Sequence, residues 1–384
     1  MTMNARYTPP AGQDWSTVTP EAAGFDADGL AAAIAFHRAH ESAWPRSMYY
    51  EDGRYVGTAQ IGDRPEHAEV IGPVRPRGEA NGLILRGGSI VAEWGDTGGA
   101  DMTFSVSKSY IGMLAGIALA DGLIGDLDER VGNTVDTGWF ETPHNAAITW
   151  RHLLQQASEW EGTLWGKPDS ADHNRVVGPA SDGGKRKGET RVLGQPGTHF
   201  EYNDVRVNLL AASLTYRFRR ARPEVLKERV MDPIGASGGW EWHGYRNAFL
   251  ELDGKSVPSV SGGGHWGGGM MIGSRDHARM GLLIARGGEW AGHQIISSGW
   301  VRAMLTPSPC NGQYGLTCWL NSGGTRLYPS GTDASVFARG AGSSVVWIEP
   351  ELDIVAVARW IASDALDGFV ERVLAACNTN PPKD

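Results

Sequence analysis

The chain has 384 residues, 41% of them apolar and 21% charged, which is enough for a sizeable core in one large domain or two. Its net charge of −9 at pH 7 argues against nucleic acid or an anionic membrane surface as a partner. No uncharged run is long enough to span a membrane, and the N-terminus lacks the basic start and apolar stretch of a signal peptide. The sequence therefore predicts a cytoplasmic protein.

The metal- and redox-active residue types are scattered. Cys310, Cys318 and Cys377 show no C-x-x-C spacing, and the histidines form no H-E-x-x-H motif. The glycine-rich run over 262–273 lacks the strand–helix–strand setting of a dinucleotide site. We expect reduced thiols, no metal and no cofactor.

The first elements expected are a helix over 22–40, which has a helical apolar period, and a hairpin over 81–95. Gly87-Gly88 between the two apolar runs of the hairpin supplies the positive φ angles of a tight turn. Residues 41–80 are rich in glycine, proline and charge, and are expected as loop or as an adapted insertion.

Later segments are helical in the middle of the chain and strand-like near its end. Helices are expected over 150–156, 204–218 and 364–376, and strands over 314–320, 335–338, 343–348 and 354–360.

Strands near residue 90 and again after residue 310 predict one mixed sheet built from both ends of the chain. The corresponding division is an α/β domain from residues 1–125 and 270–384, and a mainly helical inserted domain over 126–269.

The long apolar run from Ile111 to Ile124 is preceded by the motif Ser105-Val106-Ser107-Lys108. In a helix, Ser105 and Lys108 lie on one face within reach of each other, and Ser105 falls in the first turn. A partly desolvated lysine can take the proton of a serine hydroxyl, so this S-x-x-K spacing predicts a nucleophile and its base. The alternative is an N-capped helix with a solvated lysine.

A second constellation ends at the expected helix over 204–218. Pro196-Gly197 predicts a turn, and Tyr202 stands just before the helix. A tyrosine held beside a lysine ammonium can carry protons to and from a serine. The alternative is a half-buried aromatic ring with a solvated hydroxyl.

A third constellation is the strand-like segment 336–342, with Gly340 and Gly342 near its end. Glycines in a strand let a substrate backbone approach closely, and the N–H groups here could join that of Ser105 in binding an oxyanion. A bulged strand or a plain turn is the alternative.

Gly235-Ala236-Ser237-Gly238-Gly239 matches the nucleophile-elbow pattern G-x-S-x-G. That motif requires a strand before it and a helix after it. A helical pattern precedes Ser237 and no helix restarts after it, so Ser237 is set aside as the nucleophile.

Ser105–Lys108, Tyr202-Asn203-Asp204 and the late glycine strand together resemble the serine β-lactamase-like superfamily in order and rough spacing. Within it, the chain looks most like the class C-related esterases and amidases, which include 6-aminohexanoate-dimer hydrolases. The resemblance runs from about Leu83 to Trp360. It implies an α+β fold of the β-lactamase and penicillin-binding-protein type, in which an antiparallel sheet flanked by helices meets a mainly helical domain, with the active site in the cleft between them.

The resemblance also implies roles for single residues. Ser105 would be the acylated nucleophile, Lys108 its base and Tyr202 the proton carrier, while the backbone N–H groups of Ser105 and Ala341 would form the oxyanion hole. The residues expected to contact substrate are Asp204, Gly340, Trp165, His265 and Trp266. The last three are expected as cleft walls, with core or turn packing as the alternative.

Two departures from the family pattern bear on the substrate. Ala338-Arg339-Gly340 stands where lactamases have K-T-G, so a carboxylate-binding cation is missing from the first position, and Arg339 alternates to the other face of a regular strand. Asp204 replaces an asparagine and brings a charge toward Lys108.

We therefore expect a serine hydrolase that cleaves a small ester or amide without an obligatory carboxylate, through an acyl-enzyme. A β-lactamase or D-amino peptidase is the alternative within enzymes, and a non-catalytic binding or sensing module is the alternative outside them. Joint retention of Ser105, Lys108 and Tyr202 argues against the binding module. Nothing in the sequence indicates an oligomeric state.

Overall fold

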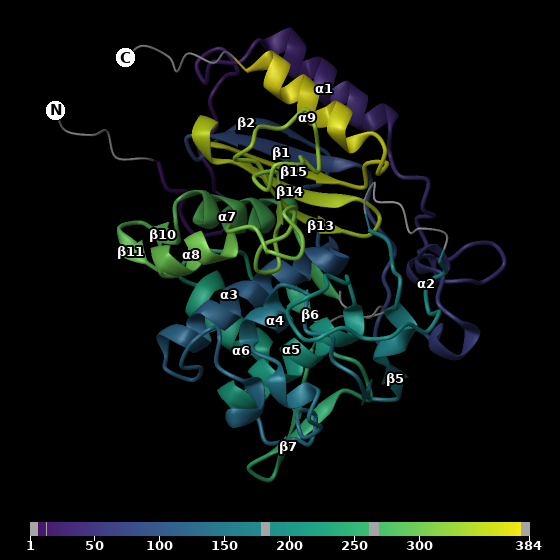
Figure 1. Ribbon diagram of the computed structural model, residues 1–384. Helices are drawn as coiled ribbons and strands as arrows, with labels where there is room; N and C mark the ends of the chain where they lie inside the picture. The colour runs from purple at the N-terminus through teal and green to yellow at the C-terminus, as the bar shows by residue number, and fades with distance from the viewer. Residues whose placement is uncertain (1–6, 13, 178–184, 261–268, 378–384) are drawn as a thin grey trace.

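The computed structural model describes residues 7–12, 14–177, 185–260 and 269–377 (Figure 1). Its main element is a six-stranded sheet in the order β12-β13-β14-β15-β1-β2, in which every pairing is antiparallel. The strands are β1 (Asn81–Arg86), β2 (Ser89–Trp94), β12 (Trp319–Leu320), β13 (Val336–Gly340), β14 (Ser344–Glu349) and β15 (Ile354–Arg359).

The predicted sheet from both ends of the chain is present, because β15 pairs with β1 over its whole length, from Asn81↔Arg359 to Arg86↔Ile354. The sheet is antiparallel and not mixed, and short turns join β1 to β2, β13 to β14 and β14 to β15. The turn between β1 and β2 has φ angles of 62° at Gly87 and 91° at Gly88, as the hairpin prediction requires.

Helices cover both faces of this sheet (Figure 1). The helices α1 (Ala27–Ala39) and α9 (Leu366–Ala376) lie on one face, and α7 (Ser274–Ala285) lies on the other. Alternate residues of the strands fill the two layers, with Val346 and Val355 facing α7 and Trp347 and Ala356 facing α1 and α9.

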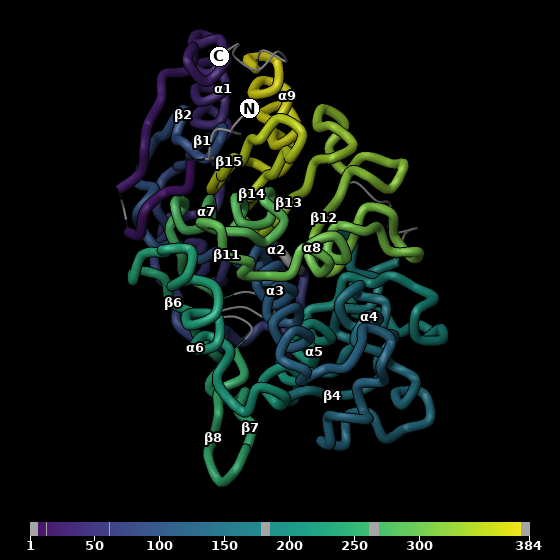
Figure 2. Tube along the Cα trace, turned by 90° about the vertical axis from the view of Figure 1, so that its left-hand side faces the viewer, coloured from purple at the N-terminus to yellow at the C-terminus, as the bar shows by residue number. Residues whose placement is uncertain are grey.

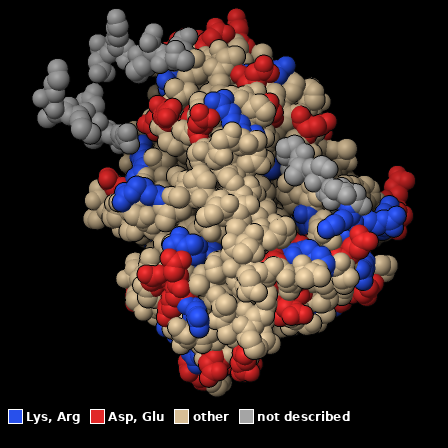
Figure 3. Space-filling view, viewed as in Figure 1, with Lys and Arg blue, Asp and Glu red and all other residues tan. Residues whose placement is uncertain are grey.

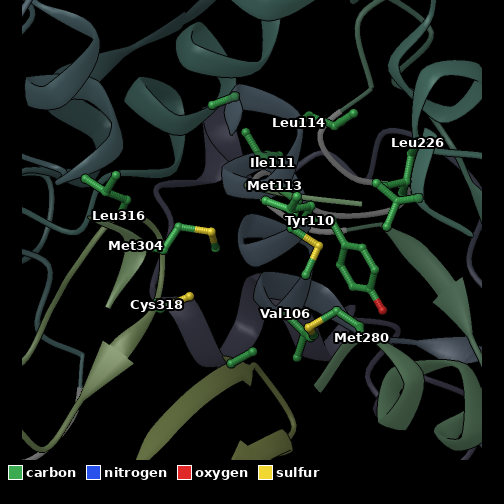
Figure 4. Close-up of a cluster of buried hydrophobic side chains, with 14 of the residues drawn as sticks. Val106, Tyr110, Ile111, Met113, Leu114, Leu226, Met280, Met304, Leu316 and Cys318 are labelled. Carbon is green, nitrogen blue, oxygen red and sulfur yellow. The ribbon is translucent and has the colours of Figure 1, made fainter. Parts of the chain in front are cut away.

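The middle of the chain is largely helical and packs below the sheet (Figure 2). Its helices are α3 (Ser107–Ala120), α4 (Trp150–Leu154), α5 (Asp204–Phe218) and α6 (Arg222–Leu226). Helix α3 is buried along almost its whole length, which matches an apolar run without a polar face (Figure 4). Helix α5 has the predicted bounds because the Asn203 side chain caps it, accepting from Arg206 N at 3.2 Å.

The remaining elements are short. They are α2 (Val56–Ile61), α8 (Ser298–Met304), β3 (Asp101–Met102), β4 (Thr163–Leu164), β5 (Lys167–Pro168), β6 (Glu241–Trp242), β7 (Phe249–Leu252), β8 (Lys255–Pro258), β9 (Met270–Ile272), β10 (Glu289–Trp290) and β11 (His293–Gln294). No helix in the described part of the chain is long and apolar enough to cross a membrane.

Two sequence expectations need correction. Residues 41–80 were expected as loop, but they contain α2. The strand expected over 314–320 joins the sheet only at β12, because Thr317 has φ 61° and takes the segment out of an extended conformation.

The division into residues 1–125 with 270–384 and residues 126–269 stays a prediction. One core cluster includes Leu83, Tyr110, Leu209 and Leu283, and so draws on both parts.

Candidate active site

Ser105 lies in a tight turn between a short strand and the central helix. Strand β3 leads into a 3₁₀ turn at Phe104–Val106, which continues as α3, so Ser105 precedes the helix in which it was expected. Phe104 has φ 48°, a costly conformation for an aromatic residue, and it is held there by full burial and an edge-on contact with Trp44 at 5.6 Å. The turn leaves Ser105 half-exposed to a pocket while its neighbours are buried.

Lys108 is one turn further along the chain and reaches back to the serine. Its Nζ donates to Ser105 Oγ at 2.6 Å and forms an ion pair with Asp204 Oδ1 at 2.8 Å. It also lies 4.8 Å from the centroid of the Tyr202 ring. Lys108 is 1% exposed, so it is not the solvated lysine of the alternative interpretation.

Tyr202 is held at the start of α5 by packing on both sides. Its ring stacks on Trp319 with centroids 5.5 Å apart, and the guanidinium carbon of Arg175 lies 5.3 Å from the ring centroid. The ring is almost fully buried, yet the residue lines the same pocket as Ser105. The three residues predicted as catalytic are thus brought together.

A largely buried ionic network extends from Lys108 along the wall of the pocket. Asp204 bridges Lys108 and Arg175, and Asp172 lies 3.7 Å from Arg175 and 3.0 Å from the Lys187 ammonium. Burial opposes the Asp172 carboxylate, but Lys187, Lys167 and Arg175 outweigh it and hold its pKa well below the usual range. Burial likewise opposes the Arg175 guanidinium, and Asp204 and Asp172 raise its pKa above the ordinary value.

Asp204 was expected to contact substrate, and the structure places it in this network. It is 1% exposed, is not among the described residues that line the pocket, and faces Lys108 and Arg175. These contacts let it position Lys108, and its contact with substrate stays a prediction.

The pocket has a volume of about 520 Å³ and is open to solvent beside β13. Ser105, Tyr202, Gly340 and Ala341 all line it, as the predictions for the nucleophile, proton carrier and oxyanion donors require. Its other lining residues are Ser42, Trp44, Gln60, Asn174, Arg175, Val176, Val177, Lys187, Trp319, Arg339, Gly342, Ser343 and Ser363.

Gly340 also has a task within the fold. A Cβ at this position would lie 2.1 Å from the Thr103 carbonyl oxygen, so the glycine admits the chain's own backbone next to the nucleophile turn. Its contact with substrate stays a prediction.

Trp165, His265 and Trp266 were expected to form walls of the cleft. Trp165 is absent from the described lining of the pocket and packs beside Ile71, Tyr245 and Ala248, an arrangement that favours the core-packing alternative. His265 and Trp266 lie outside the described residues.

Ser237 is not among the described residues that line this pocket. Its Oγ donates to Asp276 Oδ2 at 2.5 Å and its N–H donates to Asp276 Oδ1 at 2.9 Å. No strand directly precedes it in the described chain, so the nucleophile-elbow geometry is missing.

Sequence reasoning missed Trp44, Arg175 and Lys187 as neighbours of the site. Trp44 belongs to the 41–80 segment, which has no helical or strand periodicity. Arg175 and Lys187 lie in or beside polar, glycine-rich sequence that indicated only loop. Arg175 and Lys187 are held at the site by ion pairs with Asp204, Asp63 and Asp172, which a local sequence pattern does not indicate.

A sequence-family model described as Beta-lactamase matches residues 101–360, and the chain therefore belongs to this family. The match spans the Ser105 turn, α5 and the β13–β15 strands. Family membership supports a serine-hydrolase type of chemistry.

Solved structures agree on the fold. The chain is similar to a putative 6-aminohexanoate-dimer hydrolase from Bacillus anthracis (15% identity, 77% of this chain, 78% of that one, TM-score 0.54). It is also similar to the octameric penicillin-binding protein homologue from Pyrococcus abyssi (16%, 84% and 76%, 0.55) and to a penicillin-binding protein homologue from Caulobacter crescentus (14%, 95% and 100%, 0.57). The predicted α+β fold of the β-lactamase and penicillin-binding-protein type is thus confirmed.

Proposed function

We propose that this protein is a serine hydrolase that cleaves a small ester or amide through a covalent acyl-enzyme on Ser105. The observation that carries the proposal is the 2.6 Å contact between Lys108 Nζ and Ser105 Oγ at the wall of an open pocket. A serine becomes an effective nucleophile when a neighbouring base can take its proton, and these two atoms meet that requirement.

In the proposed acylation step, Ser105 Oγ bonds to the substrate carbonyl carbon as its hydroxyl proton passes to the Lys108 amine, which acts once it has given up its extra proton to solvent. The N–H groups of Ser105 and Ala341 bind the oxygen that becomes negative. As the tetrahedral intermediate collapses, the bond to the alcohol oxygen or amine nitrogen breaks and Tyr202 gives its hydroxyl proton to that leaving group. The proton that Lys108 took from Ser105 then passes to Tyr202 and restores both groups. Deacylation repeats these steps with water, which releases the acid and restores the Ser105 hydroxyl.

The decisive experiment is intact-protein mass spectrometry after exposure to a fluorophosphonate, combined with hydrolysis of p-nitrophenyl acetate and butyrate. Wild type should gain one adduct. Ser105→Ala should gain none and should lose esterase activity by about 10³-fold or more, because the nucleophile is removed.

Ser237→Ala is the matched control, since it deletes another serine hydroxyl that already has a carboxylate partner. We expect it to be labelled at the wild-type rate. Labelling and turnover that persist in Ser105→Ala would refute the proposal.

A further inference from the structure

Arg339 reaches the active-site pocket from the face of β13 opposite to Ala338. Ala338 is buried in the core cluster around α3, so no cation occupies that position. Arg339 nevertheless lines the same pocket as Ser105. Arg339 does alternate to the face opposite Ala338, as expected, and that face also borders the pocket beyond the end of the β12–β13 ladder at Phe337.

Two aromatic rings fix the position of the Arg339 guanidinium. Its carbon lies 5.5 Å from the Trp319 ring centroid and 5.2 Å from that of Tyr328, and both rings are nearly buried. Trp319 also stacks on Tyr202, so the guanidinium shares one aromatic wall with the proposed proton carrier. Such packing orders the charged group without neutralising it.

The guanidinium has spare hydrogen-bonding capacity. Its Nη1 is buried beside the Tyr328 hydroxyl, and none of the described carboxylates forms an ion pair with Arg339. The side chain as a whole is only partly buried and lines the pocket, so part of the guanidinium faces a ligand there.

The other cations at the pocket are already matched by carboxylates. Arg175 pairs with Asp204, and Lys187 pairs with Asp63 and Asp172. No aspartate or glutamate is among the described residues that line the pocket. Arg339 is therefore the cation there that still lacks a described counter-ion.

We propose that Arg339 binds a carboxylate of the substrate, so that the preferred substrates are esters or amides that carry this group. The inference rests on the proposed function and deepens it by naming a substrate class. It replaces the sequence-based expectation that no carboxylate is needed. The fork of N–H groups on a guanidinium matches the two oxygens of a carboxylate, and Trp319 would support the pair from one side.

The test compares the hydrolysis of matched esters that differ in whether they carry a carboxylate. Mono-p-nitrophenyl adipate and p-nitrophenyl hexanoate differ in the end of the acyl chain, while 4-carboxyphenyl hexanoate and phenyl hexanoate differ in the leaving group. In at least one pair, the wild-type preference for the anionic ester, expressed as a ratio of kcat/KM values, should fall about 10- to 100-fold in Arg339→Gln. The pair that responds shows which side of the scissile bond bears the carboxylate.

Arg339→Lys and Arg339→Glu complete the series. The lysine variant should retain part of the preference, because it keeps the charge but not the fork, and the glutamate variant should disfavour both anionic esters. Ratios that are the same in wild type and all three variants would overturn the inference. Fluorophosphonate labelling of Ser105 separates the two failures: labelled protein with unchanged ratios refutes only the carboxylate site, whereas unlabelled wild type refutes the proposed function itself.

Discussion

At the scale of single residues, the nucleophile is presented by a strained turn with firm supports. Thr103 N–H donates to the Met270 carbonyl at 2.8 Å, and the Thr103 hydroxyl lies 2.6 Å from His277 Nε2. Burial holds the pKa of His277 well below its ordinary value, so the ring stays neutral behind the turn. These contacts stabilise the positive φ of Phe104, which aims Ser105 at the pocket instead of the core.

Asp204→Asn should destabilise the protein by about 3–5 kcal/mol, because it leaves Arg175 and Lys108 buried without their shared carboxylate. Urea unfolding measures the loss. The double variant Asp204→Asn/Arg175→Met should recover part of it, since the orphaned guanidinium is removed as well. A single-variant loss below about 1 kcal/mol would show that the network contributes little.

At the scale of elements, β13 and the Ser105 turn form one unit, because the strand crosses directly over the turn. Gly340 makes this contact, and the three-residue loop after it places Ala341 at the pocket. The position of the Ala341 N–H relative to the Ser105 N–H, the two proposed oxyanion donors, therefore depends on the lack of a side chain at Gly340.

Gly340→Ala should destabilise the fold by about 1–3 kcal/mol and sharply reduce esterase activity, because the added methyl group meets the Thr103 carbonyl and must push the strand away from Ser105. The unfolding midpoint and p-nitrophenyl butyrate hydrolysis measure the two effects. Gly238→Ala is the control, since a Cβ there meets no described atom within 4 Å, and it should behave like wild type. Equal behaviour of the two variants would contradict the assignment.

The elements that the sequence predicted well are those whose signal is local. Helix α5 has a capping asparagine and a steady apolar period, and the β1–β2 hairpin has its glycine turn. The S-x-x-K spacing likewise predicted the Ser105–Lys108 contact, because a single helical turn is enough to bring the two residues together.

The parts of the site that sequence reasoning missed depend on contacts across the fold. Asp204 could be placed near Lys108, but its second partner Arg175 lies 29 residues earlier in an aperiodic segment. The role of Gly340 required the position of Thr103, and the access of Arg339 to the pocket required knowing where the β12–β13 ladder stops. No residue pattern encodes these relations.

At the scale of the whole molecule, the sheet is enclosed by helices, and the face in Figure 3 mixes acidic and basic side chains around a broad uncharged area. A buried histidine joins the helix layer to the sheet. The neutral ring of His37 on α1 accepts from the Trp94 indole at its Nδ1 (3.0 Å), and its Nε2 donates to the Arg359 carbonyl (3.0 Å). Burial lowers the pKa of His37 to about 4, against the partial opposing effects of Arg359 and Glu41.

Stability should therefore fall on acidification. Because the pKa of His37 is lower in the folded protein than its ordinary value of 6.5, the unfolded chain binds the extra proton, and stability is lost as the pH falls from about 6.5 through about 4. The loss from this group should reach about 3 kcal/mol. Urea unfolding at a series of pH values measures it.

His37→Gln should flatten this pH dependence, while His40→Gln, which alters an exposed histidine just beyond the same helix, should keep the wild-type slope. Parallel pH profiles for wild type and His37→Gln would show that other groups govern acid sensitivity.

The pairing of β1 with β15 also has a consequence for synthesis on the ribosome. The β1–β2 hairpin emerges early, but the strand that covers its inner edge follows only after most of the chain has been made. At ordinary elongation rates this delay is on the order of tens of seconds. During that interval the apolar edge of β1 is open to pairing with other nascent chains, so expression yield should depend on chaperone supply more than the finished protein's stability suggests.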